Sequence, residues 1–214
     1  MFDKKELCQD CIHYDYVINQ KNVLLVAKSH QKRMVEFFMK LLEQEDMKCN
    51  IIADGKVIQI GWCLYKIIYR NDRFQIFVCD LKNNPLTNIT DDLTYALSLF
   101  ERQMNIVKKI KNVEVVETSY NHTLTISQKA LSQNKIYMER QEPIGNGRDS
   151  GWYIGSFDDE VSSNPNDYLC IYTYQLIDIC EKAIDLLQLP IGILAIIEGH
   201  TIIDVVDKNN QKLL

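Results

Sequence analysis

The amino-acid sequence predicts an α+β fold in two parts, each a mainly antiparallel sheet with one or two helices packed on one face. Short apolar runs are separated by turn-forming pairs such as Asp54-Gly55 and Asn71-Asp72, which is typical of antiparallel hairpins. Longer segments repeat apolar residues at helical spacing, twice in the first half and once in the second. One continuous sheet shared by both halves is the alternative, and the strand-helix order at the start leaves room for some parallel pairing.

The first half shows the order strand, helix, strand, strand, strand, helix. Its apolar runs predict strands at residues 22–28, 49–53, 56–69 and 73–81. Ser29 is the expected N-cap of the first helix, which ends near Glu45, and Thr90 is the expected N-cap of the second. The first dozen residues are polar, so we expect them to be loosely held.

The second half is predicted to hold several strands and one helix. It begins with residues 124–131, and strands are expected at residues 135–141, 151–155 and 169–172, followed by a helix over 173–187 and a hairpin of 193–197 with 202–206. Residues 113–118 form either one more strand or the bridge between the halves. The polar run from Ser119 to Thr123 indicates a boundary, so the predicted domains are 1–118 and 119–214.

Composition and charge limit the classes of protein to which the chain can belong. The chain has 214 residues, of which 46% are hydrophobic and 25% charged, as in globular proteins. A net charge of -5 argues against a nucleic-acid partner and fits a basic protein partner slightly better. No apolar run approaches the roughly 20 residues needed to cross a bilayer. Residues 1–7 are too polar for a secretory signal, so we expect a cytoplasmic protein without membrane contact.

The seven cysteines indicate thiols rather than a disulfide framework. An odd count in a chain without a signal is typical of reduced cysteines. Cys8 and Cys11 have a two-residue spacing with His13 nearby, but zinc prefers four ligands and a second such cysteine pair is absent from the sequence. We therefore expect two free thiols, with a metal site or a redox pair as alternatives, and predict no metal and no cofactor.

Residues 148–167 are the most informative stretch of the chain. Asp149 is followed by Trp152 and Tyr153, which lie on a short predicted strand and therefore point to opposite faces. The acidic run that comes next consists of Asp158, Asp159 and Glu160. Adjacent residues of an extended segment alternate sides, so we do not expect all three carboxylates to converge on one cation. A solvated acidic loop and a partner-binding loop are the two main interpretations, and aromatic anchors are common in protein interfaces.

No catalytic residue is predicted. The four histidines are isolated in the sequence, whereas a hydrolase triad requires a nucleophile, a base and an orienting carboxylate together. Ser150-Gly151-Trp152 has no nucleophile-elbow pattern. The segment 145–147 contains two glycines but lacks the third glycine of a dinucleotide-binding loop.

From Ile126 on, the chain carries a series of motifs in a fixed order. They are Ile126-Ser127, the segment 135–143, Asp149-Ser150-Gly151-Trp152, the acidic run, Asn164-Pro165-Asn166 and Pro190-Ile191-Gly192. In these motifs the chain resembles a bacterial family, formerly a domain of unknown function, now grouped with the immunity proteins of polymorphic toxin systems as immunity protein family thirty-three. The chain departs from the family pattern at Glu139-Arg140-Gln141-Glu142, where the family has an Arg-Glu pair, and in the insertion of Ser156 and Phe157.

The resemblance implies an intracellular protein that binds and blocks a toxin and catalyses no reaction. We expect an acidic and aromatic contact surface for a protein partner such as a basic toxin domain, in which Arg140 pairs with a carboxylate and holds the loop. The expected surface residues are Asp149, Trp152, Tyr153, Asp158, Asp159 and Glu160, supported by Arg140. A scaffold or regulatory domain that acts through the N-terminal half is the alternative, followed by a metal-dependent hydrolase. The oligomeric state is left open.

Overall fold

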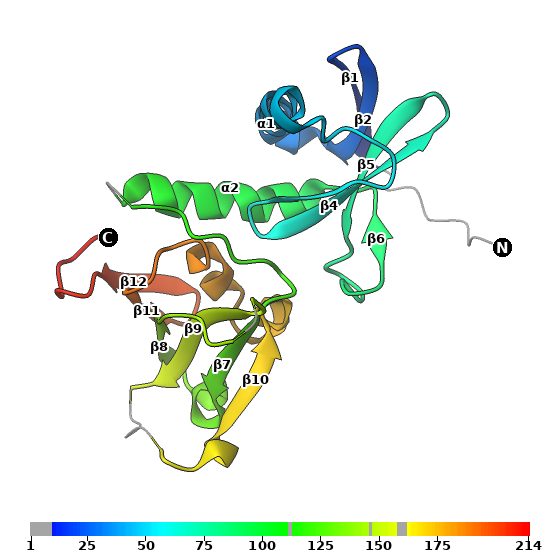
Figure 1. The fold of residues 1–214 in the computed structure, drawn as a ribbon. Coiled ribbons are helices and arrows are strands. Elements are labelled where there is room, and N and C mark those ends of the chain that lie inside the picture. Colours follow the sequence, from blue (N-terminus) through cyan, green and yellow to red (C-terminus); the bar gives the residue numbers. More distant parts are fainter. Residues whose placement is uncertain (1–9, 111–112, 146, 158–161) are drawn as a thin grey trace. The chain divides into compact units, whose positions relative to one another are not determined.

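The computed structural model describes residues 10–110, 113–145, 147–157 and 162–214. Within them it shows an α+β protein with two six-stranded, mixed but mainly antiparallel sheets and three α-helices, which confirms the predicted fold class. The chain divides into two compact units, Met1–Glu101 and Arg102–Leu214, and each contains one of the sheets (Figure 1). The strands of the described residues pair within two separate sheets, so the alternative of one continuous sheet is wrong.

The N-terminal sheet has the strand order β1-β2-β5-β4-β3, with β6 paired to β5. Its strands are β1 (Cys11–Ile18), β2 (Lys21–Lys28), β3 (Val57–Ile60), β4 (Cys63–Arg70), β5 (Arg73–Cys79) and β6 (Ile89–Thr90). β2 and β5 run parallel, and the other neighbours are antiparallel. The β4–β5 hairpin turns at Asn71 and Asp72, whose φ angles of 51° and 59° suit the type I′ turn that favours such residues.

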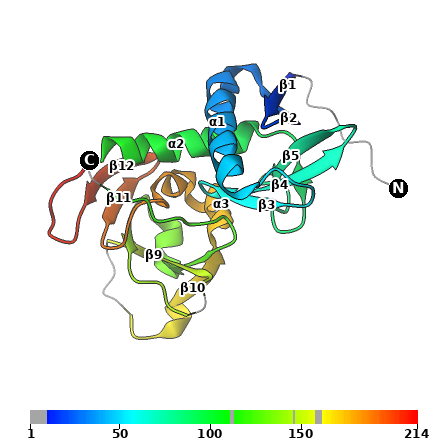
Figure 2. The same ribbon diagram turned by 45° about the horizontal axis from the view of Figure 1, so that its top comes forward.

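Helix α1 packs on this sheet, and helix α2 begins in the same unit. Helix α1 (Lys32–Cys49) follows a 3-10 turn, η1 (Ser29–Gln31), and packs against the β1–β2 hairpin (Figure 2). Its buried face places the ring of Phe38 at 4.7 Å from that of Tyr65 in β4. Helix α2 (Thr94–Lys109) begins where Asp92 accepts a hydrogen bond from the Thr94 N–H at 2.9 Å, because a carboxylate satisfies a free amide at a helix start.

The C-terminal sheet has the strand order β10-β7-β9-β8-β11-β12 (Figure 1). Its strands are β7 (Thr123–Ser127), β8 (Lys135–Arg140), β9 (Asp149–Ser156), β10 (Tyr168–Tyr172), β11 (Leu194–Glu198) and β12 (Thr201–Val206). β7 and β9 run parallel and the other neighbours antiparallel. The short helices of this unit are η2 (Gln128–Ser132), η3 (Pro165–Asp167), η4 (Thr173–Gln175), α3 (Leu176–Cys180) and η5 (Glu181–Leu186).

Several elements differ from the predictions. Residues 11–18 form strand β1, so the expectation of a loosely held start is wrong at residues 11 and 12, and its other residues up to 9 lie outside the described part of the chain. Residues 49–53 form no strand because α1 continues to Cys49 and ends at Asn50 in the left-handed region. Residues 56–69 split into β3 and β4 at a turn, and 113–118 lie outside any strand. The helix predicted over 173–187 is broken at Cys180, whose backbone is extended with φ -158° and ψ 81°. Neither Ser29 nor Thr90 is an N-cap, since they belong to η1 and β6.

The division between the two units falls within α2. Phe100 lies 6.1 Å from Phe37 of α1, ring to ring, whereas Arg102 is the first residue of the C-terminal unit and makes its ion pairs within that unit. Arg102 donates from Nε to Asp185 at 2.7 Å and from Nη1 to Glu181 at 2.5 Å. Burial opposes the charge of Arg102, but these two ion pairs prevail and raise its pKa. The predicted boundary between residues 118 and 119 stays a prediction about independent folding.

None of the helices formed by the described residues has both the length and the hydropathy that crossing a bilayer requires. Cys11, at the start of β1, is disulfide-bonded, so the expectation of reduced cysteines is wrong at this position. Cys8 lies outside the described residues. Five other cysteines carry free thiols: Cys49, Cys63, Cys79, Cys170 and Cys180.

Candidate functional site

The C-terminal sheet has an inner face that forms the core of its unit and an outer face that is partly open. Residues of a strand alternate between faces, and β8 and β9 follow this rule closely. Met138, Trp152 and Ile154 are at most 1% exposed on the inner face. Tyr137 and Tyr153 point to the outer face and are partly exposed. As expected, Trp152 and Tyr153 therefore lie on opposite sides of the sheet.

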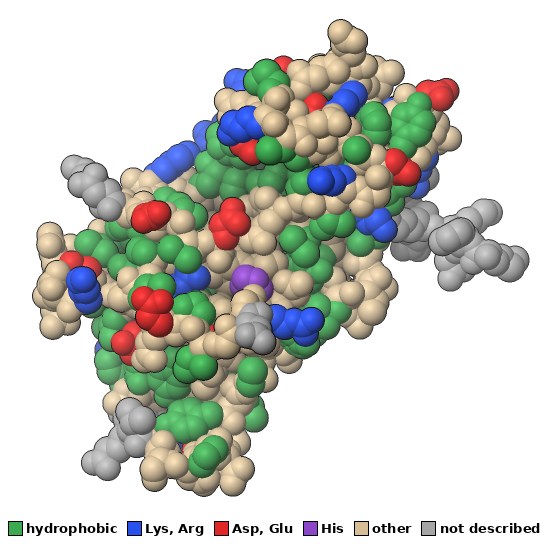
Figure 3. Space-filling model, in the orientation of Figure 1, with side chains coloured by type: hydrophobic (Ala, Val, Ile, Leu, Met, Phe, Trp, Pro, Cys, Tyr) green, Lys and Arg blue, Asp and Glu red, His purple; other side chains and the backbone are tan. Residues whose placement is uncertain are grey.

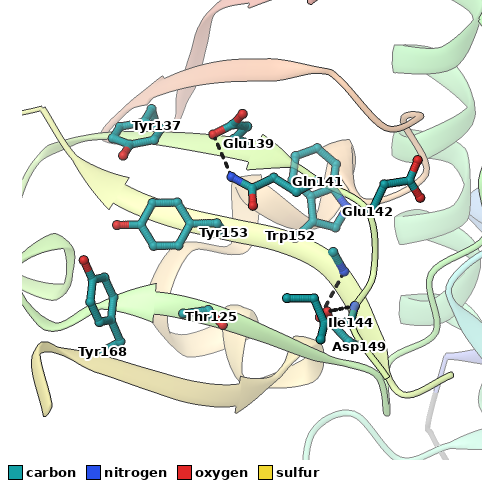
Figure 4. Close-up of a pocket in the computed structure, with 11 residues that line it drawn as sticks. Thr125, Tyr137, Glu139, Gln141, Glu142, Ile144, Asp149, Trp152, Tyr153 and Tyr168 are labelled. Atoms are coloured by element: carbon teal, nitrogen blue, oxygen red, sulfur yellow. Dashed lines mark hydrogen bonds between the residues drawn. The ribbon is translucent and has the colours of Figure 1, made fainter. Parts of the chain in front are cut away.

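The outer face carries a pocket of about 360 Å³ (Figure 4). Strands β7, β8, β9 and β10 form its floor, and the segment that joins β8 to β9 forms one end. The described residues that line it are Thr125, Tyr137, Glu139, Gln141, Glu142, Ile144, Asp149, Gly151, Trp152, Tyr153 and Tyr168.

Three tyrosines from three strands form a row at one end of the pocket (Figure 4). The ring of Tyr153 lies 5.8 Å from that of Tyr137, edge to face, and 6.1 Å from that of Tyr168. Gly155 stands opposite Tyr137 in the β8–β9 register, and a Cβ atom there would lie 2.4 Å from the tyrosine ring. The glycine therefore allows Tyr137 to lie across β9, where an edge-to-face pair contributes about 0.5–1.5 kcal/mol.

Carboxylates line the pocket from the tyrosine row to its other end. Glu139 stands directly opposite Tyr153 in the register, and Glu142 and Asp149 follow toward the β8–β9 connection (Figure 4). No Lys or Arg is among the described residues that line the pocket. Figure 3 shows acidic side chains among hydrophobic ones on the visible surface of the C-terminal unit. The pocket therefore combines aromatic rings with negative charge.

Asp149 holds the end of the pocket together. Its Oδ2 accepts a hydrogen bond from the Ile144 N–H at 2.7 Å, and its Oδ1 accepts one from the Gly151 N–H at 3.0 Å. Gly151 has a φ of 73°, and a Cβ atom there would lie 2.2 Å from the carbonyl oxygen of Gln141. The Asp-Ser-Gly-Trp motif thus sets the path of the backbone at the pocket, which is a reason for its aspartate and its glycine.

Arg140 lies in the core, where it contacts carbonyl groups. It is 2% exposed, and its guanidinium donates to the carbonyls of Val116, Leu187, Leu189 and Ser150 at 2.5–3.2 Å and to the hydroxyl of Thr118 at 2.9 Å. The expected pairing with a carboxylate of the acidic surface is not among its contacts with described residues. Burial lowers the pKa of Arg140 to about 10, so the side chain stays charged at pH 7.

Trp152 also belongs to the core. Its indole Nε1 donates to the Leu187 carbonyl at 3.2 Å, and the guanidinium of Arg140 lies 5.6 Å from its ring centroid. Because its side chain is 1% exposed, Trp152 supports the floor of the pocket from the inner face and offers little surface to a partner. The same holds for Arg140, since both face the core by strand alternation.

The acidic run of Asp158, Asp159 and Glu160 lies outside the described residues. Phe157, just before it, is 47% exposed and stands 5.8 Å from Tyr137, ring to ring. Within the described part of the chain, no group of three or more His, Cys, Asp or Glu side chains is placed to hold a metal ion.

Among the residues that line the pocket, sequence reasoning missed two tyrosines and two glutamates: Tyr137, Tyr168, Glu139 and Glu142. The signal for two of them was present, since Tyr137 and Glu139 are two residues apart in a predicted strand and so share a face. Tyr168 joins them only through the pairing of β10 with β7. No local pattern reveals such a pairing.

The C-terminal sheet thus has one buried face and, on the other, a pocket that combines aromatic rings with carboxylates. A family model for the Imm33-like domain matches residues 102–208, and the chain belongs to this family. The match confirms the resemblance drawn from the sequence and places the C-terminal half in an immunity-protein family, which implies a protein partner. No curated protein and no solved structure matches the chain.

Proposed function

We propose that this protein is an immunity protein that neutralises a cognate bacterial toxin by binding it through the outer face of the C-terminal sheet. The observation that carries the proposal is the pocket of three tyrosines and three carboxylates in the unit that matches the Imm33-like domain. The proposed binding is non-enzymatic, as is typical of immunity proteins, and takes place in the cytoplasm.

The chemistry of the pocket suits a basic protein surface. Tyrosine side chains are enriched at interface hot spots, because they bury a large apolar area and keep a polar end. Carboxylates beside them attract a positively charged partner over several ångströms and raise the association rate. Tyr153 and Glu139, opposite each other in the register, provide these two properties at one point.

The acidic run is proposed to extend this surface. In sequence it directly follows Phe157, whose exposed ring joins the tyrosine row. Asp158, Asp159 and Glu160 would then add negative charge for long-range attraction, while the tyrosine row provides the close contacts.

The experiment that tests the proposal starts from capture of the tagged chain in a lysate of its host. Each captured protein is then expressed in a bacterial host, alone and together with the wild-type chain or the variant Tyr153→Ala. We expect one partner to stop growth when alone, the wild-type chain to restore growth, and Tyr153→Ala to fail. Restoration by Tyr153→Ala as complete as by the wild-type chain would move the interface away from the pocket. If no captured protein stops growth when it is expressed alone, the proposed immunity function is wrong.

A further inference from the structure

The pocket has the dimensions and the chemistry of a receptor for one side chain. Its volume is about 360 Å³, and its tyrosine row stands beside carboxylates on a sheet whose inner face is buried in the core. Glu139 is partly exposed and accepts one hydrogen bond, from Gln141 Nε2 at 3.2 Å, so its carboxylate retains free acceptor positions. Glu142 is exposed at the rim.

The carboxylates of the pocket differ in what they can still bind. Asp149 is engaged by two backbone N–H groups and serves the local fold. Glu139 and Glu142 make no bond to a backbone amide in the described structure, and the described lining contains no positive charge to neutralise them. A cation brought by a partner would meet Glu139 beside the ring of Tyr153, which stands opposite it in the register, and Glu142 at the rim would add to the attraction.

We propose that the pocket receives an arginine side chain of the protein partner, with its guanidinium against Tyr153 and its N–H groups directed at Glu139, while Glu142 adds negative charge at the rim. This inference rests on the proposed function and names the chemistry that the pocket recognises. The negative charge of the pocket selects a positively charged occupant. A planar guanidinium stacks on aromatic rings and donates to carboxylates at the same time, whereas lysine offers a single, more strongly hydrated charge.

The test uses the full chain and small probes of defined charge. Wild-type protein labelled with ¹⁵N is titrated with N-acetyl-arginine amide, with the lysine analogue and with the neutral isostere N-acetyl-citrulline amide. Backbone amide shifts locate the binding site. We expect millimolar binding of the arginine probe, with shifts centred on Thr125, Glu139 and Tyr153, weaker binding of the lysine probe and no localised shifts with citrulline.

Variants separate the pocket from general surface charge. Glu139→Gln removes one charge from the pocket and is expected to weaken arginine binding by about tenfold, as for loss of a charge-assisted hydrogen bond. Glu198→Gln removes a charge from the exposed end of β11, outside the pocket lining, and is expected to change nothing. Equal shifts with arginine and citrulline, or equal binding by Glu139→Gln and wild type, would overturn the inference. A dispersed spectrum of each variant shows that it is folded.

The outcome is independent of the toxin experiment. Binding of the arginine probe without a growth-inhibiting partner would leave the cation site standing and remove the immunity function. A partner that depends on Tyr153, together with an arginine probe that does not bind, would leave the function standing and overturn the inference.

Discussion

Arg140 shows how one side chain organises the C-terminal unit. Its guanidinium joins the segment before β7, the residues after η5 and the start of β9, three stretches that are far apart in the sequence. The motif strand of the family resemblance contains this arginine, but its position in the core could not be predicted, because Arg is mostly exposed unless it is paired. Carbonyl groups from other segments satisfy its donors, and those contacts appear only in the fold.

Replacing Arg140 with methionine is expected to destabilise the protein strongly. Several buried carbonyls lose their donor at once, and each unsatisfied group costs about 1–3 kcal/mol, so we expect a total of at least ~3 kcal/mol. Urea unfolding of wild type and Arg140→Met measures this. The control is Arg148→Met at an exposed position nearby, where we expect less than ~0.5 kcal/mol. Equal effects of the two variants would refute the role given to Arg140.

Asp46 is a buried charged residue of the N-terminal unit, as Arg140 is of the C-terminal unit. Asp46 makes the stability of the N-terminal unit depend on pH. Burial opposes ionisation of Asp46, but hydrogen bonds from Asn19, from the Ile52 N–H and from Lys21 prevail and lower its pKa below the usual 3.8. A carboxyl group whose pKa is lower in the folded state than in the unfolded state stabilises the fold at pH values above its unfolded-state pKa. This stabilising contribution is lost as the pH falls through the folded-state pKa.

Below about pH 4, we therefore expect the urea concentration at the unfolding midpoint of the N-terminal unit to decrease. The decrease should be smaller in Asp46→Asn than in wild type. At pH 7 the same variant should have a lower midpoint than wild type. Glu43→Gln, an exposed acid on the same helix, is the matched control and should follow the wild-type curve. Parallel pH curves for Asp46→Asn and wild type would show that Asp46 does not carry the effect.

At the scale of elements, strand β9 contains two glycines with different tasks. At Gly151 an added Cβ meets the backbone of Gln141 and φ is positive, so Gly151→Ala has no low-energy solution. At Gly155 it meets only the far end of the Tyr137 side chain, which can rotate away. The first glycine therefore supports the fold, and the second supports the shape of the pocket.

These roles predict opposite phenotypes for the same substitution. Gly151→Ala should cost at least ~2 kcal/mol in urea unfolding. Gly155→Ala should cost about 1 kcal/mol or less and displace Tyr137, so that the partner binds at least fivefold more weakly. Urea unfolding and a binding titration on both variants check this. A Gly155→Ala variant with an unchanged affinity would show that the position of Tyr137 does not matter.

Some elements of the fold could be predicted from the sequence, and others could not. Strands β8 and β11 and the turn at Asn71-Asp72 were predictable, because alternation and turn residues are local signals. β1 was not predicted: half of its residues are exposed, and it pairs with β2 at an edge of the sheet, where tertiary pairing decides whether a strand forms. The acidic and aromatic chemistry was foreseen in part through Tyr153 and Asp149. The pocket depends on β10 and β8, which only sheet pairing brings together.

For the whole molecule, the chain contains two units, and the family match begins at Arg102, the first residue of the second unit. Residues before 119 make contacts inside this unit. Gln188 Nε2 donates to the Thr118 carbonyl at 3.0 Å, and Arg102 pairs with Asp185. We therefore expect a fragment of residues 94–214, which keeps all of α2, to unfold at higher urea concentration than 119–214. Equal midpoints would support a boundary at 118 and 119.

The central claim is that the tyrosine pocket of the C-terminal unit binds the protein partner. The most direct measurement is the dissociation constant of the captured partner for wild type, Tyr153→Ala and Glu198→Gln. Loss of a hot-spot tyrosine costs about 2 kcal/mol or more, so we predict at least about 30-fold weaker binding for Tyr153→Ala and wild-type affinity for Glu198→Gln. A Tyr153→Ala variant that is folded and binds the partner with wild-type affinity would contradict the claim.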